Sequence, residues 1–199
     1  MRWRGRGAAV AATVLVGLMT AGCTGDATPT GPTGTHSPSA SADAPSATPT
    51  ASPAPDVSVP PARPDAMATP SADGAAAAAS YFLQLYPYAY ASGDLSEWDS
   101  MSDPACGFCT NVRSNVTRLQ ETGHRDDEST VTVVSQSAAE IVAGESYSAL
   151  VVVDQTPSRE LAPDGTVVSS DEGGRFEMTF ALSWKDGWRV AEVDVARVS

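Results

Sequence analysis

Cys106 and Cys109 are the residues whose type and spacing most clearly allow chemistry. They form the sequence Cys-Gly-Phe-Cys, at the expected start of a helix. Three uses are open: a structural disulfide, a thiol–disulfide exchange site with a lowered thiol pKa, or part of a metal site. A redox motif of this spacing normally follows a β-strand, whereas a helix and a turn are expected before this pair. A metal would need further ligands, and His124 is the only histidine after His36.

The third cysteine, Cys23, follows an N-terminal secretion signal. Three arginines within residues 1–7 precede an apolar run at 8–19, and small residues at 20–22 lead into Cys23. This order predicts a secretory signal peptide over 1–22, because the apolar run is shorter than the ~20 residues that cross a bilayer. The junction resembles the lipobox of bacterial lipoproteins, in which the cysteine thiol receives diacylglycerol and becomes the mature N-terminus. We expect lipidation of Cys23, and an ordinary cleaved signal or a retained anchor are the alternatives.

A lipid anchor would place the chain on the extracytoplasmic face of the cell membrane. Disulfides form and persist in such oxidising compartments. Acylation would also remove Cys23 from disulfide chemistry and leave two cysteines. The sequence therefore favours a structural disulfide between Cys106 and Cys109.

Acid–base chemistry would need polar groups in a cavity, and the available groups are Tyr81, Tyr86, Tyr88, Tyr90, His124 and Asp154. Of these, Tyr86, Tyr90 and Asp154 are the candidate cavity groups. Asp154 ends an apolar run at 149–153, where burial would raise its pKa and let it act as a base. The plainer interpretation is that Asp154 faces water in a turn, that the tyrosines pack as amphipathic side chains, and that His124 is solvated in a charged loop. The sequence carries no nucleophile, phosphate-loop or metal-helix motif. We assign no catalytic residue, and we expect no metal or cofactor.

Composition divides the chain into a tether and a domain. Residues 23–72 are rich in Ser, Thr, Pro and Ala, and 11 of the 15 prolines lie there. Such a segment buries too little apolar surface to offset its ordering entropy, so we expect a disordered tether that spans about 40 Å as a coil. The net charge is −12, and it becomes more negative without the three arginines of the signal. This surface repels nucleic acid, which we exclude as a partner.

Residues 73–199 form one domain in which helical periodicity gives way to strand periodicity. We expect a helix from an Asp73 cap to Gly93, kinked or broken near Pro87, a short helix at 95–101, and a helix from Pro104 to residue 122. The segments 130–136, 146–155, 176–184 and 188–198 alternate as strands do, and Asp-Gly pairs at 164–165 and 186–187 predict hairpin turns. This order predicts an α+β fold with helices packed on one face of a curved antiparallel sheet.

Three separated motifs carry a resemblance to a known family. Residues 88–94 (YAYASGD), 106–109 (CGFC) and 184–193 (WKDGWRVAEV) resemble an uncharacterised family of actinobacterial lipoproteins. Their arrangement is similar to the nuclear-transport-factor-2-like cone fold, and the resemblance covers about residues 75–196. It implies an extracytoplasmic location and a cone-shaped α+β domain, and it implies no activity. Pro87 departs from the pattern of the family.

Three functions follow from these features as hypotheses. The first is a tethered, non-enzymatic module that binds a small ligand or a cell-envelope protein. The second is an extracytoplasmic isomerase or lyase that uses a cavity carboxylate. The third is a redox lipoprotein that uses Cys106 and Cys109. We favour the first because the sequence has no catalytic constellation.

Overall fold

A computed structural model of the chain describes residues 56–127 and 130–198. The signal peptide, Cys23 and most of the tether lie outside these residues. Within the described part, no helix is both long enough and apolar enough to cross a membrane.

Three α-helices and a short 3₁₀ helix make up the helical layer. The 3₁₀ helix η1 spans Asp65–Ala68, and the α-helices are α1 (Ala72–Ser92), α2 (Ser96–Met101) and α3 (Gly107–Thr122). Both long helices end at a glycine in the left-handed conformation, Gly93 after α1 and Gly123 after α3. These two ends are the ones that the sequence predicts.

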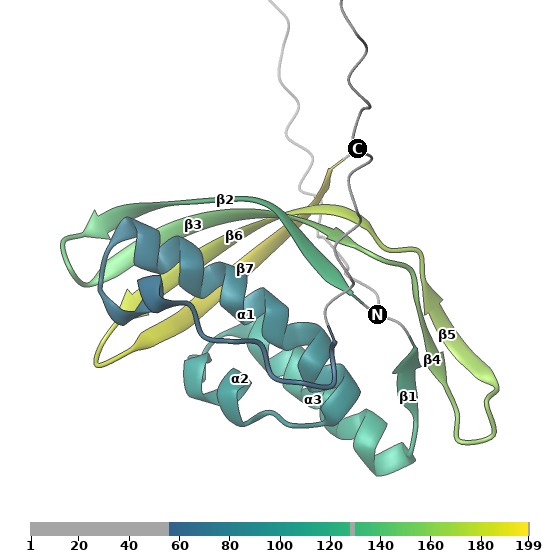
Figure 1. Cartoon of the computed structure of the whole chain (residues 1–199). Coiled ribbons are helices and arrows are strands. Elements are labelled where there is room, and N and C mark those ends of the chain that lie inside the picture. The colour runs from purple at the N-terminus through teal and green to yellow at the C-terminus, as the bar shows by residue number, and fades with distance from the viewer. Residues whose placement is uncertain (1–55, 128–129, 199) are drawn as a thin grey trace, which may run out of the picture. The chain divides into compact units, whose positions relative to one another are not determined.

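The strands form two antiparallel sheets. The larger has the order β2-β3-β6-β7, from β2 (Val131–Val142), β3 (Ser146–Gln155), β6 (Gly174–Trp184) and β7 (Trp188–Val198). The smaller has the order β1-β4-β5, from β1 (Arg125–Asp127), β4 (Ser158–Leu161) and β5 (Val167–Asp171). In Figure 1 the larger sheet arches over α1, and the smaller sheet hangs from one end of the arch beside α3.

The predicted α+β architecture, with helices packed on one face of a curved antiparallel sheet, is confirmed. Alternate residues of β6 are buried against the helices, among them Phe176, Met178 and Phe180, while Thr179 on the opposite face is exposed. The two Asp-Gly pairs lie in the predicted hairpin turns. Trp184 and Trp188 pair across the second turn, with ring centroids 5.1 Å apart.

Helix α1 begins earlier than predicted, and of the two outcomes predicted at Pro87, a kink or a break, the break does not occur. It starts at Ala72, and its N-cap is Ser71, whose Oγ accepts a hydrogen bond from the Gly74 amide at 3.0 Å, in place of the predicted Asp73 cap. It runs unbroken through Pro87, so the predicted break is absent. The Pro87 side chain is buried within α1, and packing on both sides of a helix outweighs the loss of one backbone hydrogen bond.

Helix α3, in contrast, begins later than predicted. Asp103 and Pro104 form a turn in which Asp103 Oδ1 accepts from the Ala105 amide at 2.8 Å. The Asp103 amide donates to the Val190 carbonyl at 3.0 Å, which ties this segment to β7. The helix starts at Gly107, after Cys106.

The domain also begins before residue 73. Met67 of η1 is buried, and the Trp188 indole Nε1 donates to the Met67 carbonyl at 3.0 Å. Residues 56–72, which composition assigned to the tether, therefore belong to the same compact unit as α1. Arg63 adds an ion pair with Glu97 of α2, so apolar, hydrogen-bonded and charged contacts together attach this segment to the domain.

A substitution at Gly74 tests how closely residues 66–69 pack on α1. A Cβ atom at Gly74 would lie 2.3 Å from the Thr69 carbonyl oxygen and 3.0 Å from the Trp188 ring, whereas one at Gly107 would meet nothing within 4 Å. We expect Gly74→Ala to lower the free energy of unfolding by about 2 kcal/mol despite the higher helix propensity of alanine.

The matched control is Gly107→Ala, for which we expect a change within about 0.5 kcal/mol. Urea denaturation followed by tryptophan fluorescence measures both. Equal stability of the two variants would mean that residues 66–69 do not pack against α1 as the structure has them.

Candidate functional site

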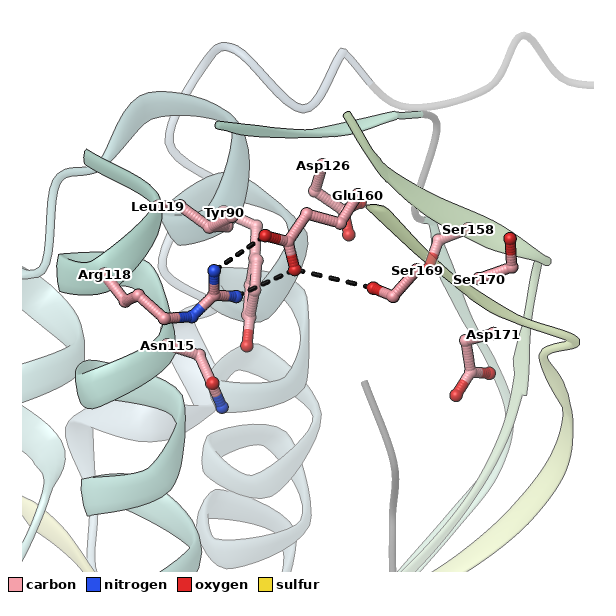
Figure 2. Close-up of a pocket in the computed structure, with 10 residues that line it drawn as sticks. All are labelled: Tyr90, Asn115, Arg118, Leu119, Asp126, Ser158, Glu160, Ser169, Ser170 and Asp171. Carbon is pink, nitrogen blue, oxygen red and sulfur yellow. Dashed lines mark hydrogen bonds and ion pairs between the residues drawn. The ribbon is translucent and has the colours of Figure 1, made fainter. Parts of the chain in front are cut away.

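A small polar pocket lies where α1 and α3 face the smaller sheet. Its volume is about 60 Å³, and most of its lining side chains are polar or charged. Figure 2 shows the residues that line it: Tyr90, Asn115, Arg118, Leu119, Asp126, Ser158, Glu160, Ser169, Ser170 and Asp171. We call this the polar pocket.

Local structure brings these residues together from distant parts of the chain. Asn115 and Arg118 lie three residues apart on α3, and therefore on one face of that helix. The turn at Gly123 leads directly into β1, where Asp126 is the strand partner of Glu160. Glu160 is in turn the partner of Ser169, and Ser158 is the partner of Asp171. A row of polar side chains thus crosses all three strands of the smaller sheet.

Glu160 is a carboxylate of the pocket with several partners. Arg118 binds it with both terminal nitrogens, Nη1 to Oε1 at 2.6 Å and Nη2 to Oε2 at 2.8 Å. His124 Nδ1 lies 2.7 Å from Oε1, and Ser169 Oγ lies 3.5 Å from Oε2. The hydrogen bonds from Arg118 lower the pKa of Glu160 from 4.5 to about 2, with a smaller contribution from His124 and against the effect of burial. Glu160 is therefore charged at neutral pH, and a carboxylate held this way is a poor general base.

Tyr86 and Tyr90 form a pair at the C-terminal part of α1. Their rings lie 4.7 Å apart, and both residues are buried. Burial raises the pKa of both phenols, and the nearby charge of Asp126 raises it further. Both hydroxyls stay protonated at neutral pH, so they are neutral groups that donate or accept hydrogen bonds.

The predicted cavity groups divide into two sets. Tyr90 lines the polar pocket. Tyr86 is beside it, and it also lines an apolar cavity of about 10 Å³ between α1 and the sheet. Asp154 lies elsewhere, on the face of β3 away from the helices, where its side chain is 48% exposed.

Asp154 is neither in a cavity nor in the expected turn. Both of its carboxylate oxygens accept from Arg175 on β6, from Nε and Nη2 at 2.7 Å each. These hydrogen bonds lower the pKa of Asp154, whereas the acid–base hypothesis required a raised one. The alternation of β3 explains the placement, because Val153 and Gln155 face the interior and Asp154 between them faces out.

Neither the partial burial of His124 nor the smaller sheet was predicted from the sequence. His124 was expected to be solvated, and the structure has it half-buried against Glu160. Strands β4 and β5 were not predicted, because β4 is four residues long and charged, and β5 carries no alternating apolar pattern. The Asp164-Gly165 turn was the one available signal of this hairpin.

The cysteine pair is a buried disulfide. Cys106 and Cys109 are bonded, and both residues are 0% exposed. Cys106 Sγ accepts from the Cys109 amide at 3.1 Å, and the Trp98 indole donates to the Cys109 carbonyl at 3.2 Å. Exchange requires a thiolate to reach a sulfur atom, and these sulfurs are covered. Among the described residues, no group of three or more His, Cys, Asp or Glu side chains could hold a metal ion.

Comparison with solved structures finds proteins of similar fold at low sequence identity. The intermembrane space region of the chloroplast protein ARC6 is 13% identical, with a TM-score of 0.50, over 64% of this chain and 98% of that one. An uncharacterised protein with a cystatin-like fold from Caulobacter vibrioides is 17% identical, with a TM-score of 0.40, over 61% of this chain and 88% of that one. The first likeness concerns the fold alone.

Comparison with sequences finds one family. No curated protein matches the chain. The model of a family of unknown function (DUF6318) matches residues 46–194, which include the whole described domain apart from its last strand residues.

The buried disulfide predicts slow reaction with thiols. In native buffer, we expect dithiothreitol to reduce Cys106–Cys109 only as fast as the domain opens, and in urea within seconds to minutes. Replacing both cysteines with alanine should lower the free energy of unfolding by ~2 kcal/mol, because the closed loop is short. Alkylation followed by mass spectrometry measures the first effect, and urea denaturation the second. Rapid reduction of the folded protein would contradict a purely structural role.

The Glu160 contacts predict a pH-dependent contribution to stability. The folded-state pKa of Glu160 is lowered to about 2, so its contribution is present above about pH 4.5 and is lost as the pH falls toward 2. At pH 7, we expect Glu160→Gln to lower the free energy of unfolding by ~2 kcal/mol. The difference between the wild type and the variant should shrink at pH 3. Urea denaturation at both pH values measures it.

Glu121→Gln is the matched control, because Glu121 is exposed near the end of α3, the helix that carries Arg118. We expect it to change stability by less than about 0.5 kcal/mol at either pH. A difference between the wild type and Glu160→Gln that stays constant from pH 7 to pH 3 would show that the charge of Glu160 is not what stabilises the site.

Proposed function

Because the chain belongs to the DUF6318 family, whose function is unknown, we propose its function from its own residues. We propose that it is a lipid-anchored, extracytoplasmic binding module without catalytic activity. Its binding site would be the polar pocket, and its partner a small ligand or a cell-envelope protein.

The filled interior is the observation that carries this proposal. Large side chains fill the interior around α1, with Phe82, Trp98 and Phe180 all at most 1% exposed. The cavity that remains beside Tyr86 is about 10 Å³, close to the volume that one water molecule needs. An enzyme of the cone type would hold its substrate in this interior. Polar space lies instead outside this interior, in the polar pocket at the edge of the helical layer and in a broader open hollow of about 630 Å³ beside Asp103, Lys185 and Arg189.

The two enzymatic alternatives have less support. The isomerase or lyase hypothesis relied on a cavity carboxylate of raised pKa, and the pKa values of both Asp154 and Glu160 are lowered by arginine. The redox hypothesis relied on an accessible cysteine pair, and both cysteines are fully buried. Binding requires neither feature.

The proposed location depends on residues outside the described part of the chain. Residues 1–22 have the order of a secretory signal, and Cys23 follows at the lipobox position. Diacylglycerol attached to Cys23, with a further acyl chain such as palmitate, would give the multi-chain anchor that stable membrane attachment needs. The resemblance to lipoproteins of uncharacterised function supports the same assignment.

The proposal predicts a membrane-bound protein with a site that can be blocked. In cells, the full chain should fractionate with the membrane and carry the mass of a lipid at Cys23, and Cys23→Ser should remove both properties. Crosslinking in intact cells should detect a protein bound to the anchored chain. Native mass spectrometry of the extracted protein should detect a bound small molecule. Ser169→Trp, at an exposed strand position on the pocket rim, should abolish that species because the indole would fill the pocket.

The matched control is Thr179→Trp, an exposed strand position on the face of the larger sheet away from the helices. We expect it to retain the species that Ser169→Trp loses. A protein that stays membrane-bound but retains no partner or ligand would overturn the binding role. A partner retained equally by both tryptophan variants would move the site away from the polar pocket.

A further inference from the structure

The polar pocket is negatively charged although it contains an arginine. Asp126, Glu160 and Asp171 line it against the single guanidinium of Arg118, a formal charge of −2. Arg118 already binds both oxygens of Glu160. Its guanidinium therefore offers little to an added anion, and Asp126 and Asp171 bring two further carboxylates to the pocket.

The two aspartates approach the pocket from different strands. Asp126 is on β1 and Asp171 is at the end of β5, and β4 lies between them. Asp171 Oδ1 accepts from the Gly173 amide at 2.8 Å, which fixes the orientation of its carboxylate. Both carboxylates raise the pKa of Tyr86, after the larger effects of burial and of Tyr90. Their negative field therefore reaches the tyrosine pair at the inner end of the pocket.

Ser158 supplies a second and independent observation. It lines the pocket and is 94% buried, with a relative exposure of 6%. Its backbone pairs with that of Asp171, so the two side chains are neighbours on one face of the sheet. Within residues 56–127 and 130–198, its hydroxyl has no hydrogen-bond partner. A buried hydroxyl without a partner costs free energy, and such groups in native proteins are normally satisfied by water or a ligand.

We propose that the polar pocket binds a primary ammonium group, with Asp171 and Ser158 as its main acceptors. This inference rests on the proposed binding function and specifies the chemistry of that same site. An ammonium is compact and carries three donors. The carboxylate of Asp171 and the hydroxyl of Ser158 supply acceptors for these donors, and the charge of Asp171 balances that of the ammonium. The group could belong to a free small amine or to a lysine side chain of a partner protein.

Size and geometry favour this cation over others. The volume of about 60 Å³ accepts an ammonium and one or two carbons. A quaternary ammonium is larger and has no N–H to donate to Ser158. The described residues provide no cluster suited to a metal ion.

The test is an NMR titration of the full chain, purified in detergent, with ethylammonium chloride and with an acetylated lysine amide. We expect amide shifts confined to residues around Ser158, Ser169 and Asp171, and no such shifts with ethanol or tetramethylammonium at the same ionic strength. Asp171→Asn should weaken binding about tenfold or more, because a charge-assisted hydrogen bond is lost. Ser158→Ala should weaken it severalfold. Stronger binding of the lysine amide than of ethylammonium would indicate a protein side chain as the natural source, and the reverse a free amine.

Asp186→Asn is the matched control, because it removes the same charge at the exposed β6–β7 turn, where asparagine tolerates the positive φ of 56°. We expect unchanged affinity. If Asp171→Asn does not fold, Ser158→Ala still decides, because it removes only a hydroxyl. Three results would overturn the proposal. These are titrations without saturable shifts, binding of tetramethylammonium as strong as that of ethylammonium, and equal effects of Asp171→Asn and Asp186→Asn on affinity. The two proposals can fail separately. If Ser169→Trp abolishes a partner species but the pocket binds no ammonium, the binding function stands and only the proposed ammonium ligand is refuted.

Discussion

The burial of helix α1 on almost every side is the constraint on which the rest of the domain depends. The larger sheet covers one side of it and α2, α3 and η1 cover the other, so that 15 of its 21 residues are buried. Its first turns are alanines, 75–79, whose small side chains let the sheet and η1 approach closely. Farther along, Phe82, Leu85 and Tyr86 fill the wider space under the arch. A helix buried all round must be apolar all round, which is why this helix leaves almost no cavity beneath the sheet.

The position of the polar pocket follows from this constraint. Since α1 fills the arch, polar groups gather where α1 ends and the larger sheet no longer covers it. Tyr86 and Tyr90 are the last buried aromatic side chains of α1 before Gly93, and each combines an apolar ring with a hydroxyl that needs a partner. The end of α3 and the β4–β5 hairpin provide charged neighbours there. The pocket is thus the boundary between the apolar core and a small polar sheet.

The sequence predicted the parts of the fold that have a strong local pattern. The alternation in β6, the apolar stripe from Cys109 through Val112 and Val116 to Leu119, and the two glycine caps all follow from periodicity and turn chemistry. The helix starts were wrong because tertiary contacts, Trp188 with Met67 and Asp103 with β7, decide where these helices begin. The site was predicted only in Tyr90 and its neighbour Tyr86. Arg118, His124 and Glu160 meet across 42 residues of sequence, and no pattern in one sequence indicates that a short charged segment such as Ser158–Leu161 is a strand.

The smaller sheet is held to the domain by charges more than by apolar packing. Strand β5 is almost entirely exposed, and β4 buries little beyond Ser158 and Leu161. Arg118 joins α3 to β4 through Glu160. Within the sheet, Arg159 joins β4 to β1 through Asp127 at 2.5 Å. Regions with few buried apolar contacts open at a lower free energy than the core. The part of the domain that carries the pocket is therefore also the part that can adjust to a ligand, while α1, the larger sheet and the disulfide stay fixed. The core of α1 and the larger sheet thus supplies the stability of the domain, and the smaller sheet supplies the binding site.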